Sequence, residues 1–99
     1  MIVNKTQDNG KLIIALEGRL DTTTASQLQD VLIPAFDEMK EIELNFSQLA
    51  YVSSAGLRVL LIGQKTAKAK GASMIVRNVS YDIMDVFEMT GFTNILTIV

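Results

Sequence analysis

Two adjacent serines, Ser53 and Ser54, are the side chains in this sequence best suited to chemistry. A serine hydroxyl can accept a phosphate, cap a helix, or act as a nucleophile when a base activates it. The sequence has no cysteine and no histidine, which removes thiol nucleophiles, disulfides, the usual zinc ligands and a histidine base. Helix capping is therefore the role that the residues alone favour, and no catalytic residue is assigned.

The residues after the two serines are small and lead into an apolar run. Ala55 and Gly56 precede this run, which begins at Leu57. Small side chains let another backbone approach closely. The sequence has no glycine-rich phosphate loop of the P-loop kind. We expect no cofactor, no metal site and no enzymatic activity.

The charge and hydropathy of the chain narrow the possible partners. Its 99 residues carry a net charge of −2, so no strong field favours nucleic acid or an anionic membrane. No apolar run reaches the ~20 residues that a membrane span needs, and the first residues lack the features of a signal peptide. We expect a cytoplasmic protein with no membrane insertion and one small domain over residues 1–99.

Periodicity predicts the elements that must position these serines. Alternating or continuous apolar residues indicate strands over 2–7, 11–17, 42–46, 73–77 and 94–99. Helical spacing predicts a helix from Thr24 to about Met39, a second over 55–70, and a third, short one from Ser80 through Met89. The order β-β-α-β-α-β-α-β predicts an α/β fold with a mostly parallel sheet of four to five strands and helices packed on it.

Local signals refine the ends of these elements. Asn9-Gly10 suits a tight hairpin, and Thr24 with Gln27 three residues later suggests a capping box. Pro34 predicts a kink or a restart in the first helix. Gly71 and Gly91 are placed to end the second and third helices. Residues 18–23 and 47–51 are expected to be connections.

Three segments resemble the motifs of STAS domains. The stretch 51–61, Tyr-Val-Ser-Ser-Ala-Gly-Leu-Arg-Val-Leu-Leu, is similar to the family's core motif at the start of the second helix. Gly18-Arg19-Leu20-Asp21 looks like the family's loop before the first helix. Residues 87–92, Phe-Glu-Met-Thr-Gly-Phe, are similar to its closing motif. The three segments occur in the family's order, and the resemblance covers essentially the whole chain, as a single STAS domain.

The resemblance implies a bacterial anti-sigma factor antagonist, a phosphoprotein that regulates transcription by partner switching. Such a protein binds an anti-sigma factor that is also a serine kinase, loses that binding when phosphorylated, and is reset by a serine phosphatase. Alignment on Gly56-Leu57 implies phosphorylation at Ser54. The partner-binding residues implied by the resemblance, or by their place beside its motif, are Asp21, Ser53, Ala55, Gly56, Leu57 and Arg58.

Other interpretations of these residues remain open. Ser53 or Ser54 can be simply the N-cap of the second helix, and Asp21 simply an acidic loop residue. The chain can be a non-switching STAS subunit that docks onto a transporter ATPase or another regulatory protein. Met84, Met89 and Phe92 are either core residues or a small exposed patch. In many members of the family an Asp stands where this chain has Ser53.

Overall fold

A computed structural model describes residues 1–99. It contains a five-stranded sheet in the order β1-β2-β3-β4-β5, in which only β1 is antiparallel to its neighbour. The mostly parallel α/β fold predicted from the sequence is therefore confirmed. The strands are β1 (Ile2–Asp8), β2 (Lys11–Leu20), β3 (Glu41–Val52), β4 (Ser73–Arg77) and β5 (Thr97–Ile98).

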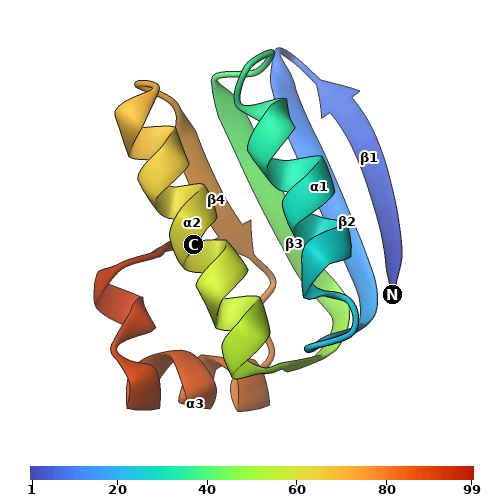
Figure 1. Cartoon of the computed structure of the whole chain (residues 1–99), viewed down its shortest axis with the longest axis vertical. Helices are drawn as coiled ribbons and strands as arrows, with labels where there is room; N and C mark the ends of the chain where they lie inside the picture. The colour runs from blue at the N-terminus through green and yellow to red at the C-terminus, as the bar shows by residue number, and fades with distance from the viewer.

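The three helices lie on one side of the sheet. They are α1 (Ala25–Ala35), α2 (Ser54–Ala69) and α3 (Tyr81–Thr90), followed by the short 3₁₀ helix η1 (Phe92–Asn94). Each crossover adds the next strand in the same direction, so right-handed connections place all the helices on the same face. Figure 1 shows α1 and α2 side by side over the sheet, with α3 across the lower end.

The hairpin between β1 and β2 forms as Asn9-Gly10 predicts. Both residues have positive φ, 52° for Asn9 and 79° for Gly10, and Asp8 pairs with Lys11 across the turn. A two-residue turn with two positive φ values has the twist that a right-handed hairpin needs. Because of this turn, β1 runs antiparallel to β2 at the edge of the sheet.

Apolar side chains that alternate along the strands meet the helices in one core. On the helix side, β2 and β3 contribute fully buried residues such as Ile14 and Leu44. Phe46 lies beneath α3, with its ring 6.4 Å from that of Phe87. The core contains 23 buried residues, which come from all three helices and from β2, β3 and β4, together with Phe36 after α1 and Leu96 before β5.

The strand β3 is longer than its sequence pattern predicts. Residues 47–51 were expected to form a connection, but they continue β3 to Val52 beside an extended β2. The pairing with β2 is shifted twice, between Ala15 and Glu17 and between Gly18 and Arg19. Each shift adds a residue to β3, as in a β-bulge, so the apolar alternation that marks a strand is lost there.

Thr24 is the N-cap residue of α1, as predicted, but its side chain makes no hydrogen bond to the helix, so the predicted capping box is wrong. Its hydroxyl instead donates to the carbonyl oxygen of Arg19 at 2.7 Å and accepts from the amide of Asp21 at 2.9 Å. The helix does not restart after Pro34; it ends at Ala35, and turns carry the chain to β3.

The other helix ends confirm their signals. Gly71 (φ 64°) and Gly91 (φ 78°) follow α2 and α3 in the left-handed conformation. The hydroxyl of Ser80 accepts from the amide of Ile83 at 3.2 Å and caps α3. The last strand, predicted over 94–99, is reduced to Thr97–Ile98, because η1 extends to Asn94 and a turn follows over residues 95–96.

The face of the sheet away from the helices carries a row of charges across three strands. Glu43 of β3 is only 5% exposed, and its carboxylate lies 3.2 Å from both Lys11 of β2 and Arg77 of β4. Burial raises the pKa of Glu43, but the hydrogen bonds and charges of these two neighbours outweigh it and leave the pKa below its usual value. Glu43 therefore stays ionised on this face.

Candidate functional site

The predicted site lies where β2 and β3 end side by side. Leu20 pairs with Val52, and the amide of Ser53 donates to the carbonyl oxygen of Leu20 at 2.9 Å. This bond continues the β2–β3 pairing by one residue into the start of α2. The carboxyl ends of parallel strands are the usual place for binding sites in α/β sheets. The structure thus brings the loop after β2 beside the serine pair.

The two serines have different roles at the start of α2. Ser53 is the N-cap, in an extended conformation, and its hydroxyl accepts from the amide of Gly56 at 3.3 Å. Ser54 is the first helical residue; its side chain is exposed and takes no part in these hydrogen bonds. The hydroxyl of Ser54 is therefore accessible at the positive end of the α2 dipole, where no acidic residue occupies the first turn.

Gly56 is required by the close approach of α2 to the end of β2. A Cβ atom at this position would lie 2.7 Å from Cγ of Leu20 and 2.9 Å from the backbone oxygen of Leu20. The oxygen belongs to the same carbonyl that accepts from Ser53. Gly56 therefore fixes how tightly the serine pair is held against β2.

The carboxylate of Asp21 organises its own loop. It accepts from the amide of Thr23 at 3.0 Å and from the hydroxyl of Thr23 at 2.8 Å, and a weaker contact comes from Thr24 at 3.3 Å. The hydroxyl of Thr23 is the main cause that lowers the pKa of Asp21, and the other hydrogen bonds in the loop act in the same direction. Asp21 is therefore a fixed negative charge beside the serine pair.

The sequence did not reveal a cation–aromatic pair at the same end of the sheet. The guanidinium of Arg19 lies 4.1 Å from the ring centre of Tyr51, and the two residues are neighbours across β2 and β3. Arg19 also reaches the carboxylate of Asp21 at 3.7 Å. Only the strand register could have revealed this pair, because 32 positions separate the residues in the sequence. Both side chains are exposed.

The remaining predicted partner-binding residues differ in exposure. Arg58 is exposed one turn into α2, and Ala55 is half-buried. Leu57, 7% exposed, and Gly56 are buried. Ser54, Arg58 and most of the Asp21 loop are therefore accessible, whereas Gly56 and Leu57 pack against the interior at the start of the helix.

The chemical groups at the site are hydroxyls, the carboxylate of Asp21 and the guanidinium groups of Arg19 and Arg58. No histidine exists in the chain to act as a base, and none of the hydrogen bonds at the site joins Ser54 to an acid or base. The structure has no group of three or more acidic side chains placed to hold a metal ion. No helix is both long enough and apolar enough to cross a membrane.

Comparison with known families and curated proteins gives a consistent result. The family model described as "Mlab, STAS domain" matches residues 3–98. A putative anti-sigma factor antagonist of Bordetella bronchiseptica, BtrV, is 31% identical over 91 residues, which cover 91% of this chain and 78% of that protein. The anti-sigma-B factor antagonist of Bacillus subtilis is 25% identical over 96 residues, covering 97% of this chain and 88% of that protein.

Solved structures show the same fold. The unphosphorylated anti-sigma factor antagonist SpoIIAA matches with a TM-score of 0.77 and 20% identity, covering 99% of this chain and 87% of that one. Its phosphorylated form, from Bacillus, matches with a TM-score of 0.76 and 21% identity, covering 99% and 91%. A putative anti-sigma factor antagonist from Thermotoga maritima reaches a TM-score of 0.90 at 16% identity, covering 97% and 84%.

Proposed function

This chain belongs to the STAS domain family, and we propose that it is an anti-sigma factor antagonist switched by phosphorylation of Ser54. Unphosphorylated, it binds an anti-sigma factor that is also a serine kinase; phosphorylated, it is released, and a serine phosphatase resets it. The names of its curated relatives support the general role. The protein acts as a ligand and a kinase substrate, not as an enzyme, and we place it in the cytoplasm.

The division of roles between the two serines carries the proposal. Ser53 supplies the cap that α2 needs, so modification of the exposed Ser54 leaves the capping hydrogen bond intact. A phosphate on the first helical residue meets unpaired backbone N–H groups and the positive end of the helix dipole. The modified chain is therefore expected to stay folded. The similar TM-scores to the two forms of SpoIIAA fit this expectation.

Phosphorylation would change partner binding through charge. It adds about −1.5 to −2 charge to a small, neutral hydroxyl on an exposed surface. A partner surface shaped for Ser54, Ala55 and Arg58 would then face an anion that it must desolvate. Asp21, already ionised beside the serine pair, adds to the repulsion of any acidic group on that partner. About 1.4 kcal/mol of penalty lowers affinity tenfold, so a few kcal/mol suffice to release the partner.

The phosphorylation itself is tested with the serine kinase encoded nearest to this protein. The two proteins are incubated with ATP, the intact mass is measured, and the phosphate is located by fragmentation. One phosphate on Ser54, absent in Ser54→Ala but retained in the exposed-serine control Ser26→Ala, is the expected result. No phosphate, together with a stable complex with a transporter ATPase, would contradict the switch and identify a docking subunit.

Substitution of Ser54 separates charge from stability. Ser54→Asp should weaken binding to the anti-sigma factor encoded nearest to the chain by at least about tenfold, while the free energy of unfolding stays within about 1 kcal/mol. Ser54→Ala should bind as wild type does and resist release by the kinase and ATP. Isothermal titration calorimetry measures the affinities, and urea denaturation measures the stabilities. Tight binding by Ser54→Asp would count against the charge mechanism.

A further inference from the structure

The outward face of α3 combines negative charge with exposed large side chains. Residues 78–99 contain three acidic residues and no lysine or arginine. The side chains of this segment therefore carry a charge of −3, which is more negative than the net charge of −2 of the whole chain. The three are Asp82, Asp85 and Glu88, all exposed on α3. Tyr81 is 84% exposed and Met89 is 86% exposed, more than the other exposed large hydrophobic residues of the chain.

Helical spacing places these five residues together. Tyr81, Asp85 and Met89 follow one another at intervals of four along α3, and Asp82 and Glu88 flank that line. The opposite side of the helix is buried through Ile83 and Phe87. The acidic and apolar groups therefore share one surface, which we call the α3 face: Tyr81, Asp82, Asp85, Glu88 and Met89.

The inner side of α3 holds this face rigidly. The ring of Phe87 lies 6.4 Å from Phe46 of β3 and 6.4 Å from Phe92 of η1. The helix is capped at both ends, by the hydroxyl of Ser80 and by left-handed Gly91. The α3 face is thus a preformed surface, and little ordering cost would oppose binding to it.

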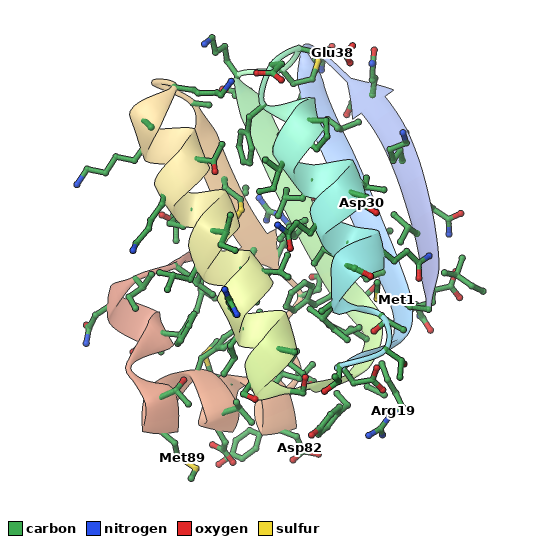
Figure 2. All side chains as sticks on the ribbon, in the orientation of Figure 1. Met1, Arg19, Asp30, Glu38, Asp82 and Met89 are labelled. Carbon is green, nitrogen blue, oxygen red and sulfur yellow. The ribbon has the colours of Figure 1, made fainter.

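The α3 face is at the same end of the molecule as the serine site. Figure 2 shows Asp82 and Met89 at the end where Arg19 projects, opposite Glu38. Figure 1 shows that α2 also begins at that end of the molecule. A partner that covers the start of α2 can therefore extend onto the α3 face. The two surfaces lie at one end of the molecule, and the first turn of α2 itself contains no acidic residue.

We propose that the α3 face docks a basic amphipathic helix of the partner protein. Lysine or arginine side chains on such a helix would pair with the three carboxylates, and a cation can also lie against the ring of Tyr81. Apolar residues on the same helix would cover Met89, whose flexible thioether adapts to irregular surfaces. The inference rests on the proposed function only in assigning this surface to the same partner.

The docking can be tested on the whole protein without any kinase. A synthetic amphipathic peptide of lysine and leucine is titrated into ¹⁵N-labelled protein, and a peptide with glutamate in place of lysine serves as the comparison. We expect saturable chemical-shift changes concentrated on residues 81–90 with the lysine peptide and none with the glutamate peptide. Shifts concentrated on α1 or on the open face of the sheet would overturn the proposal.

Two sets of variants with equal net charge decide whether the face itself matters. The substitutions Asp82→Asn, Asp85→Asn and Glu88→Gln together should weaken binding about tenfold or more. The control set consists of three exposed acids elsewhere that form no ion pair, changed as Asp8→Asn, Asp30→Asn and Glu38→Gln. This set should bind within about twofold of wild type. Equal weakening by both sets would mean that net charge alone attracts the peptide.

A milder variant keeps the test valid if the triple variant does not fold. Met89→Ser removes an exposed thioether with little effect on the core, and it should weaken the lysine peptide severalfold. Unchanged affinity in this variant would contradict the apolar part of the contact. The phosphorylation of Ser54 is read separately by mass: failed peptide docking with normal phosphorylation refutes this inference and leaves the switch in place.

Discussion

At the residue scale, one position along the chain separates a structural serine from a candidate regulatory one. Ser53 faces back onto the first turn of α2 and accepts from Gly56, whereas Ser54 points away into solvent. An N-cap must leave the helical conformation to make its bond, and the next residue already has helical backbone angles. Stability therefore depends on the first hydroxyl and leaves the second available for modification.

Stability measurements can distinguish the two serines. Ser53→Ala should lower the free energy of unfolding by about 1 kcal/mol, because it removes a cap. Ser80→Ala, which removes the equivalent cap of α3, is the matched control and should cost about the same. Ser54→Ala should stay within about 0.5 kcal/mol of wild type. Equal losses for Ser53→Ala and Ser54→Ala in urea denaturation would refute this assignment.

Glu43 makes a second prediction at this scale, in the pH dependence of stability. Its pKa is lower in the folded protein than in the unfolded chain. Its stabilising contribution is then present in full above that unfolded value and is lost as the pH falls through the lower folded value. Glu43→Gln should cost about 1–2 kcal/mol at pH 7, since Lys11 and Arg77 are partly exposed and can be hydrated.

The difference between wild type and Glu43→Gln should shrink between pH 5 and pH 2. Denaturant unfolding across this range measures it. Glu41→Gln is the control, because Glu41 lies on the same strand and face but is exposed and forms no ion pair. That variant should follow the wild-type curve. A stability gap for Glu43→Gln that stays constant with pH would show that the carboxylate acts through packing rather than charge.

At the element scale, two glycines set how closely α2 packs on its neighbours. The lack of a side chain at Gly56 lets the end of β2 approach the helix. At Gly63 it leaves room for α1 and β4, because an added Cβ would lie 2.7 Å from Leu32 and 3.0 Å from Met74. The atoms that crowd Gly63 are ends of flexible side chains, whereas Gly56 faces a backbone oxygen. The start of α2 thus has less freedom to adjust than its middle.

This difference predicts unequal costs for two alanine substitutions in one helix. Gly56→Ala should destabilise the protein by about 1–3 kcal/mol, because the backbone of β2 must move. Gly63→Ala should lie within about 1 kcal/mol of wild type, since the side chains can shift and alanine is the better helix former. Thermal or urea unfolding measures both. A larger loss for Gly63→Ala would show that helix packing, not the approach of β2, is the tighter contact.

At the scale of the whole molecule, all three helices cover one face of the sheet and leave the other to the charged row around Glu43. The edges of the sheet are also unequal. β1 is long but almost entirely exposed, and β5 is only two residues long. The central strands β2 and β3 contribute many of the core residues, and the candidate site lies at their carboxyl ends.

This arrangement predicts a gradient of local stability across the sheet. Hydrogen-bonded amides of β1 should exchange with solvent at least about tenfold faster than those of β3, because an edge strand with few buried side chains opens without disrupting the core. Hydrogen–deuterium exchange followed by NMR measures this. Equal protection of the two strands would mean that β1 opens only when the whole domain unfolds.

The sequence by itself determined the features that depend on neighbouring residues. Asn9-Gly10 marks the hairpin, Ser80 and Gly91 bound α3, and Gly71 ends α2, all as the structure shows. The strand and helix order, and with it the mostly parallel sheet, follows from the same local patterns. The serine motif likewise indicated the family.

Only the tertiary structure decided the features that depend on residues far apart in the chain. β3 stays paired with β2 through residues 47–51, with two bulges, although no apolar alternation in the sequence indicates a strand there. Thr24 bonds to Arg19 and Asp21 rather than to its own helix. The N-cap of α2 is Ser53, whose amide is held by the end of β2. Each outcome depends on how strands and loops pair in space, and sequence periodicity records only what lies within a few residues.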